Sequence, residues 1–210
     1  RNALLERAAI DPAWADAIEA RMAEAGAEMA MARSLVMDRL QASLDARPEG
    51  AFPKARLGLK GEAETMAQEG AGLAAIEEML SETWRKMRRA DAQAGRTLKG
   101  PHRADLKVIH LPTGLPAREA STGQQKALLI GLILASAQAL ADGGRGPAPL
   151  LLLDEAGAHL DADRRAALYD ALCVLPGQAW LSGTEAFLFD AFGARAQRIR
   201  VRSGAADIHD

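Results

Sequence analysis

The chain has 210 residues, 49% of them apolar, and a formal net charge of −2 at pH 7. This length allows one large domain or two small ones with a sizeable core. The balanced charge excludes a globally basic nucleic-acid binder but leaves room for a local basic patch. Cys173 is the only cysteine, which excludes a disulfide within the chain and fits a reducing compartment. It lies on an apolar helical stripe, so we expect a small buried side chain.

No apolar run approaches the 18 residues of a membrane span, and the first residues lack the apolar core of a signal peptide. We therefore expect a cytoplasmic protein without membrane contact. The first residue is arginine rather than methionine, which suggests a piece of a longer protein.

Residues 11–47 are predicted to form one long helix. Asp11 is a good N-cap, and Pro12 fits the first helical position. Apolar residues recur every three or four positions and predict one buried stripe, whereas Gly26 should weaken the helix by about 1 kcal/mol relative to alanine. The stripe consists of Trp14, Ile18, Met22, Ala25, Met29, Ala32, Val36 and Leu40.

A second amphipathic helix is predicted over residues 72–94, and it should stop at Gly95. An extended piece from Phe52 to Lys60 separates the two helices. Residues 1–97 therefore indicate a mainly helical subdomain, which is either a plain helical domain or a projecting arm. The stripe of the second helix is Leu73, Ile76, Leu80, Trp84 and Met87.

From residue 98 onward strands, glycine turns and helices alternate, which indicates an α/β lobe over residues 98–210. The four leucines of 150–153 predict a strand that is covered on both faces. In the last predicted strand, Ile199 and Val201 should point inward. The expected strands are 104–111, 115–119, 150–153, 179–182 and 197–202, and the expected helices are 122–141, 162–174 and 185–192.

The segment Ser121-Thr122-Gly123-Gln124-Gln125-Lys126 can start a helix that binds an anion. Ser121 and Gln124 match a capping box, and Gly123 keeps the first turn bare, so that a ligand can approach the backbone. The free N–H groups and the helix dipole attract phosphate, and Lys126 adds a positive charge. The segment alone is also compatible with an ordinary capped helix.

About thirty residues after this segment, two carboxylates directly follow the leucine strand. Asp154 could hold Mg²⁺, because hard oxygen ligands suit that ion, and Glu155 could polarise an attacking water. Open α/β sheets bind ligands at the carboxyl ends of their strands, although two solvated acids remain the alternative. Asp161 should cap the next helix. No metal-ligand spacing links the four histidines, so we expect no zinc site. They are His102, His110, His159 and His209.

Basic residues gather at the end of the second long helix and shortly after it. Such charges can contact DNA phosphates, but cations are also favourable at any helix end. No aromatic residues interleave with them, so stacking on single-stranded bases is not supported. The candidates for DNA contact are Arg85, Lys86, Arg88, Arg89 and Arg103, with Arg96, Lys99 and His102 nearby.

In this order, the motifs S-T-G-Q-Q-K, L-L-L-L-D-E and A-H-L-D resemble the signature motif, Walker B motif and D-loop of ABC-type ATPase heads. Gly100-Pro101-His102-Arg103-Ala104-Asp105-Leu106 narrows the resemblance to the RecF family of DNA recombination and repair proteins. The match is dense over residues 100–185 and looser over 1–95, which resemble the RecF arm. The chain is thus similar to the C-terminal half of a RecF protein.

This resemblance implies the C-terminal lobe of an ABC-type P-loop NTPase head with a mainly helical arm subdomain. It implies that the signature residues would bind ATP held by the opposite subunit. Asp154 would serve Mg²⁺, and Glu155 would be the general base. Asp161 would cross the dimer interface. Thr184 stands where many ABC proteins have a switch histidine, so slow hydrolysis is expected. The signature residues are Ser121, Thr122, Gly123, Gln124 and Lys126.

The chain contains no G-x-x-x-x-G-K-[ST] motif, so the P-loop lobe is expected upstream or in another chain, and this piece alone should not hydrolyse ATP. For the intact protein, the resemblance implies a slow DNA-dependent ATPase and an ATP-driven homodimer that clamps double-stranded or gapped DNA. It further implies recombinase loading with the mediator proteins RecR and RecO, and roles in DNA replication and the SOS response. The alternatives are the head of a transporter or another ATPase, or a pseudo-ATPase that only dimerises.

Overall fold

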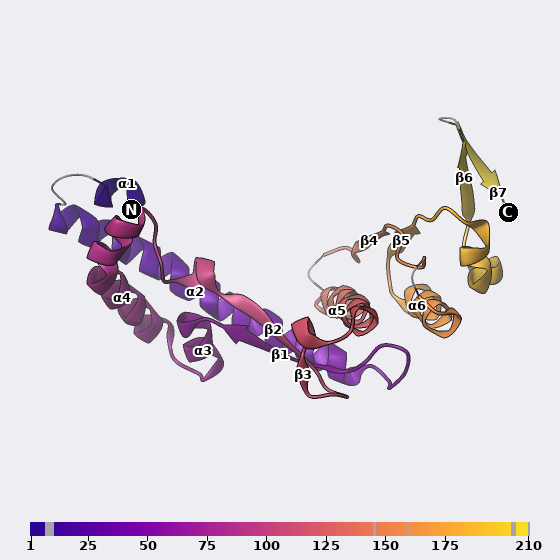
Figure 1. Ribbon diagram of the computed structural model, residues 1–210, viewed down its shortest axis with the longest axis horizontal. Helices are drawn as coiled ribbons and strands as arrows, with labels where there is room; N and C mark the ends of the chain where they lie inside the picture. Colours follow the sequence, from indigo (N-terminus) through magenta and orange to yellow (C-terminus); the bar gives the residue numbers. More distant parts are fainter. Residues whose placement is uncertain (7–10, 145, 159, 203–204, 210) are drawn as a thin grey trace. The chain divides into compact units, whose positions relative to one another are not determined.

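The computed structural model describes residues 1–6, 11–144, 146–158, 160–202 and 205–209. The chain divides into two compact units, each built from two stretches of sequence. Unit 1 comprises Arg1–Gln41 and Arg56–Ile109, and unit 2 comprises Ala42–Ala55 and His110–Asp210. Figure 1 shows the elements in chain order.

Unit 1 is mainly helical, and both predicted long helices are confirmed. Helix α4 ends at Gly95, whose φ of 62° is left-handed as expected for a glycine stop. The short helices α1 and α3 were not predicted. The elements of this part of the chain are α1 (Asn2–Leu5), α2 (Pro12–Ala46), β1 (Ala55–Lys60), α3 (Glu62–Gln68), α4 (Leu73–Ala94), η1 (Pro101–Arg103) and β2 (Asp105–His110).

The buried side of α2 differs from the predicted stripe. Val36, which belongs to that stripe, is 55% exposed, and Trp14 and Met29 are exposed as well. The residues turned toward the unit 1 core are small or charged instead. A Cβ atom on Gly26 would lie 2.9 Å from Cδ1 of Leu80 in α4. Close approach of the two helices therefore favours small residues over large apolar ones. The buried positions include Ala15, Glu19, Ala23, Gly26, Ala27 and Ala30.

Unit 1 also buries charge. The guanidinium of Arg1 donates to Glu19 at 2.8 Å and to Asp91 at 2.7 Å, and all three side chains are almost fully buried. The same guanidinium donates to the backbone oxygen of Trp84 at 2.8 Å. Buried charges are tolerated only when they are paired, which explains why a glutamate faces this core.

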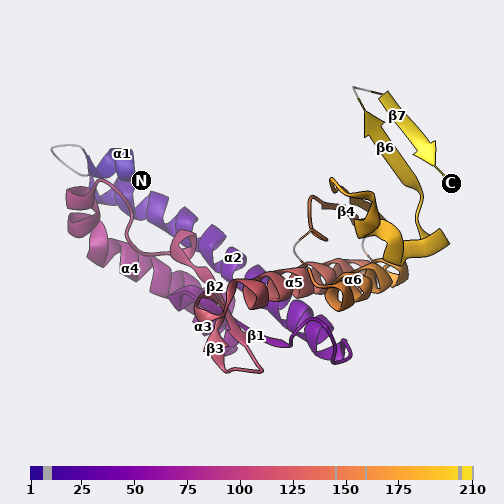
Figure 2. The same ribbon diagram turned by 45° about the vertical axis from the view of Figure 1, so that its right-hand side comes forward.

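Unit 2 contains two helices that lie side by side, α5 and α6 (Figure 2). Strands β4 and β5 form a parallel pair in which Leu153 is opposite Leu181. Strands β6 and β7 form an antiparallel hairpin. The elements are β3 (Leu115–Pro116), η2 (Ala117–Glu119), α5 (Thr122–Asp142), β4 (Leu150–Leu153), α6 (Ala162–Val174), β5 (Gln178–Leu181), η3 (Ala186–Arg195), β6 (Arg198–Arg202) and β7 (Ala205–His209).

The predicted return strand 115–119 is only two residues long, because the chain turns into the 3₁₀ helix η2 at Ala117. The predicted subdomain boundary between residues 97 and 98 also differs from the division into units. Strand β2 is hydrogen-bonded to β1, which keeps residues 98–109 with unit 1.

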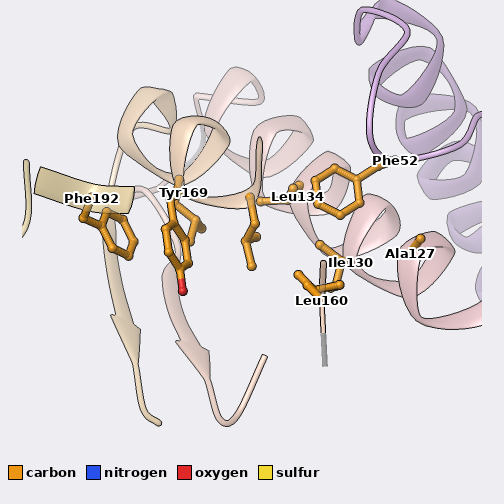
Figure 3. Close-up of a cluster of buried hydrophobic side chains, with 9 residues drawn as sticks. Phe52, Ala127, Ile130, Leu134, Leu160, Tyr169 and Phe192 are labelled. Carbon is orange, nitrogen blue, oxygen red and sulfur yellow. The ribbon is translucent and has the colours of Figure 1, made fainter. Parts of the chain in front are cut away.

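Large apolar side chains form the core of unit 2, and Figure 3 shows this cluster. The rings of Tyr169 and Phe192 stack with centroids 3.9 Å apart. The hydroxyl of Tyr169 donates to the backbone oxygen of Leu188 at 2.7 Å, and burial raises the pKa of Tyr169. Phe52 joins this core, which explains why residues 42–55 belong to unit 2. The buried members are Phe52, Ala127, Ile130, Leu134, Leu160, Leu168, Tyr169, Leu172 and Phe192.

The end of α2 is tied to α5 by two hydrogen bonds. Ser43 donates to the carbonyl of Ala135 at 2.9 Å, and Arg47 donates to the carbonyl of Gly131 at 2.8 Å. Burial lowers the pKa of Arg47. These bonds anchor the last turns of α2 in unit 2.

Within the described residues, the β4–β5 pair is covered on one face only. Leu151 and Leu153 pack against the unit 2 core, whereas Leu152 is 74% exposed and Trp180 is 49% exposed. The prediction that both faces of this strand are covered is therefore wrong for this part of the chain. Leu150, Leu152 and Trp180 form what we call the bare face.

Three further side chains of unit 2 are more exposed than the sequence predicted. In β6, Ile199 and Val201 are exposed instead of pointing inward. Cys173 is exposed rather than buried. The buried side of α6 is formed by Leu168, Tyr169 and Leu172, and successive helical residues differ by about 100° in direction, so the residue after Leu172 turns away from the core.

Candidate functional site

Helix α5 begins at the surface of unit 2, and the predicted capping box is confirmed. The hydroxyl of Ser121 accepts a hydrogen bond from the backbone N–H of Gln124 at 3.3 Å. The backbone N–H of Ser121 donates to the side chain of Gln124 at 3.0 Å. Ser121, Thr122 and Gly123 are all exposed. The first turn of this helix is therefore open to a ligand, and its dipole favours an anion.

The start of α6 lies next to the start of α5. A Cβ atom on Gly123 would lie 3.9 Å from Nη1 of Arg164. Asp161 caps α6 by accepting from the backbone N–H of Arg164 at 2.8 Å, and its carboxylate lies 3.6 Å from Nε of the same arginine. Positive potential is therefore concentrated at the start of α5. The free N–H groups of its first turn, the guanidinium of Arg164 and the half-buried Lys126 all contribute. Sequence reasoning missed Arg164, whose only signal was its position three residues after the cap.

The two acids follow β4 directly. Asp154 is exposed, and Glu155 is half-buried. Glu155 has a φ of 50°, which is left-handed and uncommon for a residue other than glycine. Strained backbone of this kind is often found at functional sites.

A tight turn joins the acids to Asp161. The N–H of Ala158 donates to the carbonyl of Glu155 at 3.3 Å, and the N–H of Leu160 donates to the carbonyl of Gly157 at 3.3 Å. A Cβ atom on Gly157 would lie 2.7 Å from the hydroxyl oxygen of Tyr169. The predicted D-loop is therefore packed against the core of unit 2. His159 of this segment lies outside the described residues.

The hydroxyl that contacts the acids belongs to Ser182, two residues before the predicted switch position Thr184. Ser182 donates to Oδ1 of Asp154 and accepts from the backbone N–H of Glu155 at 3.4 Å. Thr184 is exposed, and its side chain makes no hydrogen bond among the residues that the structure describes. Sequence reasoning missed Ser182. Its position directly after a strand that is parallel to the acid-bearing strand was the available signal.

The side chains at this site fit a magnesium nucleotide. The described residues contain no group of three or more His, Cys, Asp or Glu side chains that could hold a metal ion. Mg²⁺, however, typically takes one or two carboxylates and completes its shell with phosphate and water oxygens. Asp154 offers one such carboxylate, and the α5 start suits a phosphate. The donor set therefore fits an ion that arrives with a phosphorylated ligand.

Three of the basic candidates on α4 are paired within unit 1. Arg88 binds Asp16 and Glu19, and Arg85 binds Asp16 at 3.2 Å. The hydrogen bond that Arg88 donates to Glu19, followed by the one it donates to Asp16, raises the pKa of Arg88. Lys86 pairs with Glu82 at 2.6 Å. Most of the charge of Arg88 is thus compensated inside the unit.

The other basic residues of the cluster are exposed. Arg89, Arg96, Lys99 and Arg103 form no ion pair in the described part of the chain. The chain just before Arg103 is tied to α4, because the indole N–H of Trp84 donates to the carbonyl of Lys99 at 2.7 Å. Gly100 adopts a φ of 134°, and a Cβ atom there would lie 3.0 Å from the ring of Trp84.

None of the described helices is long and apolar enough to cross a membrane.

The chain is similar to curated proteins and to solved structures, although no protein-family model matches it. It is 50% identical over 191 residues to the DNA replication and repair protein RecF of Caulobacter vibrioides, covering 91% of the chain and 49% of that protein. It is 49% identical over 205 residues to the protein of the same name from Brucella abortus, covering 97% of the chain and 53% of that protein.

Among solved structures, the recombination mediator protein RecF-ATPrS of the RecFOR pathway superposes with a TM-score of 0.76 at 20% identity. The superposition covers 99% of this chain and 54% of that one. The RecF-ATP structure of the same pathway gives a TM-score of 0.73. The chain spans about half the length of the relatives it matches.

Proposed function

Because the chain belongs to the RecF family and corresponds to the C-terminal half of its members, we propose that it is the arm and signature-bearing lobe of an ATP-dependent DNA-binding protein of recombinational repair. In the intact protein, ATP would hold two heads together around DNA, and hydrolysis would release them. ATP can act in this way because it binds the closed pair better than the open one.

The observation that carries this proposal is the exposed, capped start of α5 beside Arg164 and Asp161. Ser121 and Gly123 would contact the γ-phosphate of ATP held by the opposite subunit. Thr122, Gln124 and Lys126 would support that contact, and Asp161 would cross the dimer interface. The open first turn supports these roles, because a phosphate needs access to free backbone N–H groups.

The acid pair would serve hydrolysis. Asp154 would hold Mg²⁺, which would neutralise phosphate charge when bound, and Glu155 would accept a proton from the attacking water. Thr184 stands at the switch position without a histidine, so we propose slow turnover. The 210-residue chain lacks a P-loop sequence, so it would hydrolyse no ATP alone.

The bare face of β4 and β5 supports the proposal that other parts of the intact protein complete this lobe. Leu152 and Trp180 are directly opposite each other in the strand pair, and both are exposed. A parallel sheet is normally covered on both faces. We propose that the half of the protein that carries the P-loop covers this face.

For DNA, we propose that Arg89 and Arg103 make the phosphate contacts, with Arg96 and Lys99 beside them. Their exposure supports this choice. Arg85, Lys86 and Arg88 would contribute less, because their charges are paired with carboxylates. Double-stranded or gapped DNA would be the ligand, in the cytoplasm, with the mediator proteins RecR and RecO as partners.

Sedimentation of the intact protein with and without ATP and gapped DNA tests the function. ATP should shift the protein to a dimer, and Ser121→Arg should block this shift without unfolding the head. Glu155→Gln should abolish turnover while leaving ATP-driven dimers. Dimers that persist in Ser121→Arg would contradict the phosphate-facing helix start. Normal turnover in Glu155→Gln would remove that residue from its role.

A charge reversal tests the DNA surface. The double variant Arg89→Glu and Arg103→Glu should weaken DNA binding and reduce the slope of affinity against salt by about 1 per lost phosphate contact. Arg21→Glu, which alters an exposed arginine of α2 outside the cluster, serves as the control. If both variants give the same salt slope, the cluster is only a solvated surface.

A further inference from the structure

The backbone of Ser182 is fixed beside the acids by the sheet. In the parallel pair, Leu153 is opposite Leu181, so Asp154 and Ser182 are each one residue beyond the last paired position. The N–H of Ser182 donates to the carbonyl of Leu153 at 3.0 Å. This bond extends the ladder by one step and holds the serine at the edge where the acids emerge.

The side chain of Ser182 contacts both acids at once. A hydroxyl can donate one hydrogen bond and accept others. Here the proton goes to Oδ1 of Asp154, and the oxygen accepts from the backbone N–H of Glu155 at 3.4 Å. One small side chain thus fixes the carboxylate of the first acid and the backbone of the second.

The hydrogen bond between the backbone N–H of Glu155 and Ser182 is made at a residue whose backbone conformation is unfavourable. Glu155 adopts a φ of 50°, which a side chain other than glycine adopts only when its surroundings enforce it. The bond from its N–H to Ser182 and the bond from Ala158 to its carbonyl hold both sides of this residue.

We propose that Ser182 is a positioning residue for the metal and the base, an inference that rests on the proposed function of Asp154 and Glu155. Its hydroxyl donates a hydrogen bond to Oδ1 of Asp154, so that Oδ2 would be available to the ion or to a water bound to it. Because Mg²⁺ demands near-ideal octahedral geometry, a ligand with a fixed orientation binds it better than a free one. The same bond network fixes the backbone of Glu155, from which its carboxylate projects.

Metal binding by the intact protein tests this role without turnover. On a Glu155→Gln background with ATP present, Ser182→Ala should weaken Mn²⁺ affinity, measured by electron paramagnetic resonance, by about 10- to 100-fold. Ser182→Thr, which keeps the hydroxyl, should restore most of the affinity. Ser136→Ala alters an exposed serine of α5 in the same unit and should change nothing.

Turnover gives a second measurement. With Glu155 intact, Ser182→Ala should raise the Mg²⁺ concentration for half-maximal hydrolysis by a similar factor and leave the KM for ATP at saturating Mg²⁺ nearly unchanged. Two results overturn the inference: Mn²⁺ affinity of Ser182→Ala equal to that of Ser136→Ala, or a loss that Ser182→Thr fails to rescue.

Asp154→Ala separates this inference from the proposed function. If Asp154→Ala keeps full Mn²⁺ affinity, the proposed metal role of that aspartate fails, and the inference fails with it. If Asp154→Ala loses the metal while Ser182→Ala keeps it, the inference alone fails.

Discussion

The two units bury apolar side chains alike but differ in the charged side chains that they enclose. Unit 1 encloses Arg1, Glu19 and Asp91 in one ion-paired group, next to alanines and Gly26. Unit 2 encloses leucines, isoleucine and aromatic rings, and His110 is the only polar or charged residue among its described buried residues.

This difference indicates that the units depend on different interactions. A buried ion pair contributes little net stability, but removal of one partner is costly, because an unpaired charge stays behind. A core of large apolar residues is stabilised by the area it removes from water. Unit 1 should therefore be sensitive to the loss of single charges, and unit 2 to the loss of apolar cover.

Removal of a buried charge in unit 1 should have the largest effect. Asp91→Ala removes one of the two carboxylates that pair with the buried guanidinium of Arg1, the one at 2.7 Å, and leaves Glu19 as the other, so the free energy of unfolding should fall by about 3–5 kcal/mol. Glu82→Ala, which breaks the exposed pair with Lys86, should cost at most about 0.5 kcal/mol. Urea unfolding of both variants measures the contrast. Similar losses in the two variants would remove the distinction between buried and exposed charge.

The bare face of unit 2 comes next. Leu152→Asn in the intact protein should lower the free energy of unfolding by about 2–5 kcal/mol if other parts of the protein cover that face. In the 210-residue chain, the same change should leave the thermal midpoint nearly unchanged, because Leu152 is already 74% exposed. Leu153→Asn, on the covered face, should destabilise both proteins. An equal response of Leu152→Asn in the two proteins would contradict the covered-face proposal.

Close packing in unit 1 gives a smaller effect. Gly26→Val should destabilise by about 1–3 kcal/mol, because even its Cβ would lie 2.9 Å from Leu80. Gly58→Val is the control, since a Cβ at Gly58 has no neighbour within 4 Å and valine suits a strand. Thermal unfolding compares the two. A stabilised Gly26→Val would show that α2 and α4 do not pack closely.

The smallest effect concerns pH. The bond from Arg88 holds the pKa of Asp16 below its ordinary value of 3.8. The folded state therefore binds fewer protons, so the contribution of Asp16 to stability is complete above that value and is lost as pH falls through the lower, folded pKa. Asp16→Asn should remove this part of the acid dependence in urea unfolding below pH 4. An unchanged acid profile would indicate that the pair is solvated.

Local signals were enough to predict the long helices. Asp11 and Pro12 mark the start of α2, Gly95 marks the end of α4, and the Ser121 and Gln124 pair marks the start of α5. Each of these is a short-range interaction that needs no knowledge of the rest of the fold.

The side of α2 that faces the core could not be predicted in the same way. Glu19 is buried because Arg1, eighteen residues away, and Arg88, on another helix, pair with it. Likewise, Gly26 is a packing position because Leu80 lies against it. Apolar periodicity favours the largest hydrophobic residues, whereas close helix packing selects the smallest ones.

The candidate site was predicted in part. The motifs identify Ser121, Asp154, Glu155 and Asp161 from sequence alone. The neighbours Arg164 and Ser182 depend on how separate elements are aligned, and neither belongs to a motif. The strand register of β4 and β5 brings Ser182 next to Asp154.

The start of β5 should restrict how much the length of the connection between α6 and β5 varies among homologues. Gly177 adopts a φ of 133°, and a Cβ atom there would lie 2.7 Å from the carbonyl oxygen of Pro149. One residue inserted between Leu175 and Gln178 would slide the strand by one position and reverse which side chains face the helices. Ser182 would then turn away from the acids. Homologues should therefore show almost no insertions or deletions in this short connection.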